Sequence, residues 1–401
     1  VEGALGASGS APVVGRWRSV ALDSPVTADA AAAALRQDDA DDAVLRVEVD
    51  AIIRPTTARD PLHQGLWGIE NTGQRVAGVA GVAGADIGAT QAWEAATTRS
   101  PVTVAVIDTG VDRSHPDLRE RMWTNPDEVV NGRDDDGNGL VDDVHGWDLH
   151  NDDATVFDGA SDAHGTHVAG TIAAAHDGAG VAGVAPNARI MPIKFLGPYG
   201  GYTSDAVAAI DYARAKGARV INASWGGGAY STALQAAIDR AVADGIVFVA
   251  AAGNANADID ATPFYPAAYP NPDQLTVAAT DNRDRRAWFS NHGTEAVDVA
   301  APGSSILSTT PGGAHRRLSG TSMAAPHVAG AAAVLLGEHP DLTPAEVREA
   351  LVEGSERVPA LADTSASGGR VDLMSALTRA GGAGGPGAEA ASPPTPVADP
   401  V

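Results

Sequence analysis

Short apolar runs alternate with longer helical patterns from about residue 60 to residue 380, and no other feature of the sequence constrains the fold as strongly. The runs have the length and composition of strands buried in a parallel sheet, at residues 102–107, 190–195, 220–223, 246–251 and 275–279. Helical patterns lie between them, most clearly at 203–216 and from about Ser231 to Gly245. The alternation predicts an α/β fold, with a mostly parallel central sheet and helices on both faces. The carboxyl ends of the strands carry the chemistry in such folds.

The charge and composition of the chain exclude several classes of function. The 401 residues include 27 Lys or Arg and 51 Asp or Glu, which gives a net charge of −24. A field of that sign repels phosphate backbones and anionic membrane surfaces, so we expect no nucleic-acid partner. The chain has no cysteine, which excludes disulfides, thiol catalysis and cysteine-ligated metals. It has no apolar run long enough to span a membrane.

Composition divides the chain into three parts. Residues 1–59 contain a partly alternating stretch at 44–53 and a polar, proline-containing linker candidate at 54–59. Residues 60–380 carry the alternation of strands and helices, and residues 381–401 are rich in Gly, Ala and Pro, as in a linker or a disordered end. The chain opens VEGALG, with neither Met nor a signal-peptide core, and we expect it to be a processed or excerpted piece.

Two candidate functional residues stand at the starts of turns or helices. Asp108 follows the apolar run 102–107 and begins Asp-Thr-Gly, although a lone motif of this kind is more often a turn. His164 begins HGTHVAG, which leads into an alanine-rich helix. His164 and His167 have a spacing that zinc can use, but HExxH, cysteine and an obvious third ligand are all missing. A general base is therefore the better interpretation of His164.

Two further candidates complete a set. Ser322 lies in GTSMAAP at the start of an apolar helix, where a serine is usually an N-cap. Its small neighbours allow a substrate backbone to approach, and free N–H groups at a helix start can hold an oxyanion. Asn254 follows the run 246–250 and is either a turn residue or an amide donor to developing negative charge. In chain order, the four residues supply an orienting acid, a base, an oxyanion donor and a nucleophile.

Four stretches of the chain closely resemble the signature blocks of subtilisin-like serine proteases. They are VAVIDTGVDRSHPDL (104–118), HGTHVAGTIAA (164–174), AAGN (251–254) and GTSMAAPHVAG (320–330), and the resemblance extends from about residue 60 to residue 380. The order Asp, His, Ser is that of subtilisin. The resemblance implies that Ser322 attacks the peptide carbonyl, that His164 takes and returns the proton, and that Asp108 fixes the imidazole tautomer. It also implies an oxyanion hole made by Asn254 and the Ser322 backbone N–H.

The resemblance also implies two edge segments between which a peptide is bound as an added β-strand. The residues concerned, with the glycine of the AAGN block, are Gly200, Gly201, Ser224, Trp225, Gly226 and Gly253. Trp225 stands where the family commonly has an aliphatic residue, which would narrow the pocket for the fourth residue before the scissile bond. Ala255 follows Asn254, so we expect an uncharged primary pocket and a hydrophobic preference.

An acidic loop predicts a calcium site. Positions 1, 3, 5, 7 and 9 of an EF-hand-like loop, with Gly139 at position 6, are filled by Asp134, Asp136, Asn138, Leu140 and Asp142. Position 12 is His145 instead of Glu, so a bidentate ligand must come from elsewhere, such as Asp143, or the site is weak. The alternative is a solvated acidic turn.

The family resemblance implies two more calcium sites. One ties down the start of the domain through the carboxylates of Asp60, Asp117 and Asp177 and the carbonyls of Ala175, Ala179 and Val181. The other resembles a site of thermophilic relatives and uses Asp148, Asp153 and the Thr155 carbonyl. Asn151 replaces an acid in this second set.

The sequence thus predicts a secreted, monomeric, calcium-stabilised, subtilisin-like serine endopeptidase that acts on polypeptides. Residues 1–59 would be the C-terminal part of a propeptide that inhibits the enzyme until self-processing removes it, or else a packed extension. Residues 60–380 would be the peptidase domain. The alternative function is a binding module, in which the same scaffold buffers calcium while its active site stays blocked.

Overall fold

The computed structural model describes residues 7–12, 18–22 and 60–383, and the chain forms two units, Val1–Thr57 and Ala58–Val401. The described part of the first unit is an antiparallel pair, β1 (Ala7–Pro12) with β2 (Arg18–Leu22). The predicted strand at 44–53 and linker at 54–59 lie outside the described residues, and so does the tail from 384 onward. Helix α8 (Leu373–Ala383) continues three residues beyond the predicted end of the domain at 380.

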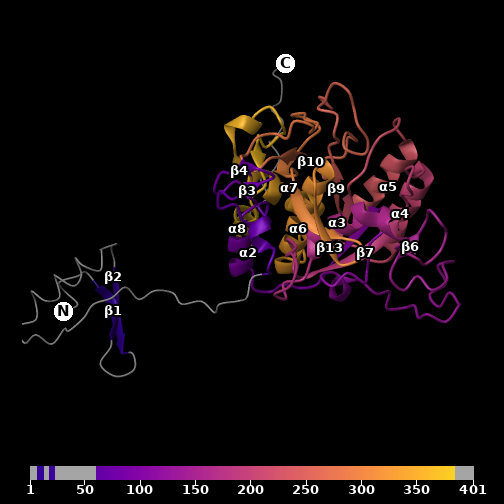
Figure 1. The fold of residues 1–401 in the computed structure, drawn as a ribbon, viewed down its shortest axis with the longest axis horizontal. Coiled ribbons are helices and arrows are strands. Elements are labelled where there is room, and N and C mark those ends of the chain that lie inside the picture. Colours follow the sequence, from indigo (N-terminus) through magenta and orange to yellow (C-terminus); the bar gives the residue numbers. More distant parts are fainter. Residues whose placement is uncertain (1–6, 13–17, 23–59, 384–401) are drawn as a thin grey trace, which may run out of the picture. The chain divides into compact units, whose positions relative to one another are not determined.

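The second unit is built on a nine-stranded sheet whose order is β14-β15-β11-β10-β9-β8-β5-β7-β6 (Figure 1). Only the pair β14–β15 is antiparallel; the other neighbours are parallel. The prediction of a mostly parallel sheet is therefore confirmed. The strands are β5 (Val102–Asp108), β6 (Trp147–Asp148), β7 (Ala188–Lys194), β8 (Val220–Ala223), β9 (Val247–Ala251), β10 (Leu275–Thr280), β11 (Val299–Pro302), β14 (Glu356–Arg357) and β15 (Gly369–Arg370).

Helices cover both faces of the sheet because its strands present apolar side chains alternately to each face. In β5, Val104 and Val106 belong to one apolar core, and Ala105 and Ile107 belong to the other. The first core is shared with α2 (Ala89–Ala95), α3 (Ala163–Ala173), α6 (Thr321–Glu338), α7 (Pro344–Glu353) and α8. The second is shared with α4 (Thr203–Ala215) and α5 (Thr232–Ala243), which pack side by side in Figure 1.

Helix α6 runs through the core with almost its whole surface buried, because its sequence is mainly Ala, Gly and Val. A Cβ on Gly330 would lie 2.7 Å from Val184, so only glycine permits this approach. The low aromatic content of the chain is thus matched by close packing of small side chains. No helix among the described residues is long and apolar enough to cross a membrane.

Two short hairpins and several single turns of 3-10 helix lie outside the central sheet and its helices. Two hairpins pair β3 (Arg75–Val76) with β4 (Val79–Ala80) and β12 (Ile306–Thr310) with β13 (Ala314–Leu318). Single turns of 3-10 helix occur at η2 (His63–Gly65), η3 (Arg119–Arg121), η4 (Ala160–Asp162) and η5 (Pro359–Leu361).

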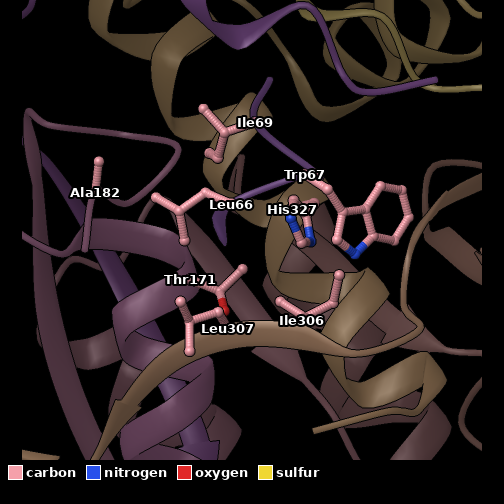
Figure 2. A pocket seen from close by; sticks show the side chains of 9 residues that line it. Leu66, Trp67, Ile69, Thr171, Ala182, Ile306, Leu307 and His327 are labelled. Atoms are coloured by element: carbon pink, nitrogen blue, oxygen red, sulfur yellow. The ribbon is translucent and has the colours of Figure 1, made fainter. Parts of the chain in front are cut away.

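A small pocket lies on the side of the sheet that α3 and α6 cover, and Figure 2 shows His327 of α6 among the side chains that line it. Nδ1 of the ring lies 2.8 Å from the Met323 carbonyl oxygen. Because a carbonyl oxygen can only accept a hydrogen bond, Nδ1 carries the proton and donates it. Burial lowers the pKa of His327 to about 4. This pocket is therefore a feature of the core and is lined by a neutral histidine.

Candidate active site

The candidate residues meet at the point in the sheet where successive strands are added first on one side of β5 and then on the other. From β5 the chain forms β7 on one side and then β8 on the other, which is the arrangement that opens a crevice at the carboxyl ends of these strands. Asp108 is the last residue of β5, Ser224 follows β8, and Asn254 lies three residues beyond β9. Parallel strands bring these ends to one edge of the sheet.

Asp108 and His164 form a direct pair. His164 is the second residue of α3, and its Nδ1 lies 2.8 Å from Asp108 Oδ1, which also accepts the Thr109 N–H at 2.7 Å. Asp108 is fully buried, while the His164 side chain keeps 34% of its surface exposed. Burial by itself would lower the pKa of His164, but the charge of Asp108 and its hydrogen bond outweigh burial and raise that pKa. The pair therefore favours the imidazolium form.

Ser322 is the second residue of α6, and its hydroxyl is bound to the end of β8. Its Oγ donates to the Ser224 carbonyl oxygen at 2.9 Å, and the Ser224 hydroxyl donates back to the Ser322 carbonyl oxygen at 2.9 Å. Within the described residues, the hydroxyl of Ser322 is thus engaged with Ser224 and not with His164. Catalytic hydrogen bonds are often made only when substrate is present, so this arrangement does not exclude Ser322 as a nucleophile.

The orientation of the Asn254 amide follows from its neighbours. Asn254 Oδ1 accepts the Thr321 backbone N–H at 2.9 Å and the Thr321 hydroxyl at 3.1 Å. The NH₂ group of Asn254 must then face the other way, as a donor. A Cβ placed on Gly320 would lie 3.6 Å from Asn254 Nδ2, 3.6 Å from Ser322 N and 3.7 Å from Asn254 Oδ1. The Ser322 N–H and the Asn254 amide therefore both lie next to Gly320, where an oxyanion hole would have to form.

Gly253 is held by the same network. Its N–H donates to Thr321 Oγ1 at 3.0 Å, and its backbone has a φ of +101°. A Cβ on Gly253 would also lie 2.4 Å from Asn291 Nδ2. Glycine is required here by conformation and by space.

The two predicted substrate edges follow β7 and β8, the strands on either side of β5. Gly197 and Gly200 exchange backbone hydrogen bonds of 3.0 and 3.1 Å, and Gly201 follows; a Cβ on Gly201 would lie 2.3 Å from the Phe195 carbonyl oxygen. Ser224, Trp225 and Gly226 follow β8, and a Cβ on Gly226 would lie 2.4 Å from the Phe264 ring. A larger side chain would clash at either position, so both edges require glycine there.

Trp225 has a role that the sequence did not indicate. Its indole Nε1 donates to the Ile107 carbonyl oxygen at 2.8 Å, and its ring meets that of Phe195 edge to face at 4.9 Å. The tryptophan therefore braces the end of β5, one residue before Asp108, besides lying on the second edge.

His164 and His167 have separate partners, so the structure gives no support to a zinc pair. His167 Nε2 lies 2.9 Å from the Ile306 carbonyl oxygen and 3.1 Å from that of Arg316. Burial lowers the pKa of His167 to about 4. Its neutral ring joins α3 to the β12–β13 hairpin.

Three residues near the catalytic pair were missed by sequence reasoning: Thr321, Lys194 and Asp162. Thr321 orients Asn254, as described above. Lys194 is 1% exposed at the end of β7 and pairs with the buried Asp162 just before α3. A lysine inside the apolar run 190–195 was the one available signal, because a buried ammonium needs a partner.

The acidic loop arranges its side chains differently from the predicted ligand set. Asp134 accepts the amides of residues 137–139, Asn138 Oδ1 accepts the Leu140 amide, and Asp142 accepts those of residues 131 and 132. Asp136 instead converges with Glu128 and Asp143, whose ligand atoms lie within 4.8 Å of one another. Of these three, only Asp136 belonged to the predicted set; Asp143 had been considered as a substitute and Glu128 was missed.

The ligands predicted at the start of the domain gather around one loop. Asp60 Oδ1 accepts the Gly178 amide at 2.8 Å, and Asp117 Oδ2 accepts the Val181 amide at 2.9 Å. Both carboxylates are buried. A Cβ on Gly180 would lie 2.0 Å from Asp117 Oδ2, so the loop forms a close cradle for that carboxylate.

The remaining ligands of this set line the same loop, since Asp177 accepts the Ala179 amide and the Ala175 amide donates to the Asp117 carbonyl oxygen. The third predicted set forms a short closed loop. Asp148 and Asp153 exchange backbone hydrogen bonds, and Asp153 Oδ1 accepts the Thr155 amide at 2.7 Å.

Comparisons with known proteins agree with this geometry. Residues 99–377 match the model of the subtilase family, Peptidase_S8. Subtilisin E of Bacillus subtilis (strain 168) is 44% identical over 263 residues, which are 63% of this chain and 60% of that protein. Thermitase of Thermoactinomyces vulgaris is 42% identical over 254 residues, 63% of this chain and 80% of its own. The match thus spans 60% of the length of subtilisin E, which is less than two thirds.

Two solved structures are similar in fold. A protease of Pseudoalteromonas arctica PAMC 21717 superposes with a TM-score of 0.64 at 33% identity, covering 81% of this chain and 100% of that one. Fervidolysin from Fervidobacterium pennivorans is described as a keratinolytic enzyme related to subtilisin. It superposes with a TM-score of 0.63 at 33% identity, and the match covers 82% of this chain and 48% of fervidolysin.

Proposed function

The chain belongs to the subtilase family, and from that premise we propose that it is a serine endopeptidase that hydrolyses peptide bonds in proteins. The observation that carries the proposal is the arrangement at the end of β5. A buried carboxylate holds an imidazole at 2.8 Å, and the Ser322 N–H at the start of α6 and the Asn254 amide both lie next to Gly320.

In this proposal Ser322 Oγ is the nucleophile. It leaves the Ser224 carbonyl, gives its proton to His164 Nε2 and attacks the scissile carbonyl carbon. Asp108 keeps the His164 proton on Nδ1, so that Nε2 can accept, and it stabilises the imidazolium that forms. His164 then returns the proton to the leaving amine, and a water molecule repeats the sequence on the acyl-enzyme.

Negative charge on the carbonyl oxygen would be received in front of Gly320. The Ser322 N–H and the Asn254 NH₂ group lie next to Gly320, and the hydrogen bonds from Thr321 to Asn254 Oδ1 would fix the orientation of the amide before the reaction begins. In subtilisin itself, loss of the corresponding asparagine costs about 10²–10³ in kcat. Preorganised donors of this kind act without further rearrangement.

The substrate would be an extended polypeptide. Backbone hydrogen bonds along Gly200–Gly201 and Ser224–Gly226 give affinity without strong sequence preference, and side-chain pockets add selectivity. Trp225 is anchored on Ile107 and Phe195, so we infer a rigid wall on the second edge. We therefore expect apolar side chains to be preferred.

We also propose calcium as a structural cofactor. Asp60 and Asp117 are buried carboxylates held by one loop, and oxygen donors of this kind fit a hard cation. With Asp177 and the carbonyls of Ala175, Ala179 and Val181, they would join the start of the domain to the loop after α3. The acidic loop and the Asp148–Asp153 loop are further candidates, the former through Glu128, Asp136 and Asp143. Calcium would supply stability and take no part in the chemistry.

The remaining parts of the proposal concern maturation. Residues 1–59 would act as a propeptide, residues 60–380 as the peptidase domain, and the mature monomer would act outside the cell. The supporting argument is the resemblance to subtilisins, which are synthesised with such a segment. Sequencing the N-terminus formed during incubation with calcium tests it, since self-processing should cut near residues 54–60 in the active protein only.

A fluorophosphonate probe and casein digestion test the proposed activity. Ser322 should be labelled by the probe because His164 activates it, and casein should be cleaved. A calcium-binding module with a blocked site would leave Ser322 unlabelled and casein intact. The Ser322→Ala variant is the control for both measurements.

A further inference from the structure

A buried ammonium lies close to the catalytic pair. Lys194, at the end of β7, is 1% exposed. Its Nζ donates to Asp162 Oδ1 at 2.9 Å, to the Thr109 carbonyl oxygen at 2.6 Å and to the Leu196 carbonyl oxygen at 3.3 Å. Asp158 Oδ2 lies 3.4 Å away. An ammonium has three N–H donors, and three acceptors are present within hydrogen-bond distance.

Stability does not account for this ion pair. Taking an ammonium and a carboxylate out of water is costly, and both Lys194 and Asp162 are almost completely buried. Replacing a buried pair by neutral side chains of similar volume is often neutral or stabilising, whereas removal of one partner is strongly destabilising. The pair therefore needs a role other than holding the fold together.

The acceptors of Lys194 belong to three segments, each of which carries part of the site. Thr109 directly follows Asp108 at the end of β5. Asp162 lies two residues before His164, at the start of α3. Leu196 directly precedes the turn from Gly197 to Gly200 that begins the first substrate edge.

The contacts between these segments are reinforced around the ammonium. Asp162 Oδ2 accepts the Asp158 amide at 2.6 Å, and the Asp162 carbonyl oxygen accepts the Thr166 hydroxyl at 2.8 Å. Thr109 Oγ1 accepts the Gly165 amide at 3.0 Å. The start of α3 is thus tied to the end of β5 by the bond from the Gly165 amide to the Thr109 hydroxyl and by the ammonium.

We propose that Lys194 is a positioning residue, which holds His164 at hydrogen-bond distance from Asp108 by joining the start of α3 to the ends of β5 and β7. The proposal rests on the proposed function, because it assigns a role in proton transfer. Reaction rates depend on separations to within about 1 Å, and a misplacement of that size can cost about 10²-fold. Arginine cannot take the role, since its planar guanidinium directs its donors differently from an ammonium.

The test compares single and double variants. Lys194→Met leaves Asp162 buried without its cation, so this variant should lose both stability and kcat. Lys194→Met/Asp162→Asn removes both charges while keeping the shape and an acceptor for the Asp158 amide. Its melting temperature should return to within a few degrees of the parent, while kcat should stay lower by on the order of 10–100-fold with KM little changed. Lys194→Arg should not rescue kcat.

Lys216→Met is the matched control, because Lys216 is the other lysine of the chain and is also paired with aspartates, Asp136 and Asp143. It should lose stability but keep the parental kcat. Active sites are counted with a fluorophosphonate, so that kcat refers to correctly folded enzyme.

A spectroscopic readout separates this proposal from the activity. The Nδ1 proton between His164 and Asp108 gives a low-field proton resonance, which should weaken or shift in the double variant and stay in place in Lys216→Met. A double variant with parental kcat and an unchanged resonance would overturn the positioning role. If the parent cleaves no peptide, the proposed function fails, and the resonance still decides whether Lys194 positions His164.

Discussion

Acid should unfold this protein partly through His327, and the size of the effect can be worked out from its surroundings. His327 is fully buried in α6, beside Leu66 and Trp67 (Figure 2), and burial lowers its pKa from 6.5 to about 4. Its Nδ1–H is held by the Met323 carbonyl, and a Cβ on Gly68 would lie 2.6 Å from Nε2. A charged ring would therefore be buried against the Gly68 backbone and the apolar side chains around it.

The sign of the effect follows from proton binding. Above pH 6.5, His327 is neutral in both the folded and the unfolded chain, so its contribution to stability is complete. As the pH falls, the unfolded chain binds a proton near pH 6.5 and the folded chain only near pH 4, so the unfolded state is favoured. The shift of about 2.5 pKa units corresponds to about 3 kcal/mol in all, of which about 2 kcal/mol is lost between pH 7 and pH 5.

Urea unfolding of Ser322→Ala protein, which cannot digest itself, measures this loss. The parent and His327→Gln are compared at pH 7, 6 and 5; glutamine keeps a donor for Met323 but does not titrate. His327→Gln should be less stable at pH 7, and its deficit should shrink by about 2 kcal/mol at pH 5. Val328→Ala, a neighbouring core change without a titrating group, should show the same deficit at every pH. A constant gap between the parent and His327→Gln would refute the reasoning.

Four further outcomes are expected. Ser322→Ala should abolish casein hydrolysis while leaving the fold intact, with a loss of about 2 × 10⁶ in kcat as in subtilisin; near-normal cleavage would exclude the mechanism. Gly320→Ala should lower kcat by on the order of 10²-fold or more without loss of melting temperature, because its backbone is extended while its Cβ would lie 3.6 Å from both proposed oxyanion donors. Gly253→Ala, by contrast, should lower the melting temperature, since its φ is positive and its Cβ meets Asn291. EDTA should lower the melting temperature strongly while changing the initial rate little. Calcium at 1,000 times its Kd would stabilise the folded state by about 4 kcal/mol, and EDTA removes this stabilisation. An unchanged melting temperature would contradict structural calcium.

The elements that could be predicted are those whose partners are local in sequence. The apolar run 102–107 became β5, and the helix expected from Ser231 is α5, with Ser231 as its N-cap accepting the Leu234 amide. Boundaries shifted by one or two residues where tertiary hydrogen bonds decide them. The run 190–195 became β7 (Ala188–Lys194), and the Phe195 amide, one residue beyond it, continues this ladder with a hydrogen bond to the Asp108 carbonyl oxygen of β5.

Side-chain pairs that join distant segments were not predictable by the same route. Lys194 and Asp162 are 32 residues apart, and Glu128 meets Asp136 and Asp143 only because the acidic loop folds back on itself. Periodicity reports which face of an element is buried, but not which charge lies opposite. The β12–β13 hairpin was missed for a related reason: its second strand is mostly exposed, so it has little apolar pattern.

The mutual hydrogen bonds of Ser322 and Ser224 would keep the proposed nucleophile and the proposed substrate edge in register. Each residue's hydroxyl donates to the other's carbonyl, so the start of α6 is joined to the end of β8. In the proposed mechanism, Ser322 would give up one of these bonds on turning toward His164, at a net cost of about 0.5–1.5 kcal/mol, and would gain a bond to the imidazole in exchange. The Ser224 hydroxyl, which also accepts from Asn222, would keep its bond to the Ser322 carbonyl. The backbone of the proposed nucleophile would therefore stay in place while its side chain moves, and the Ser322 N–H would stay next to Gly320.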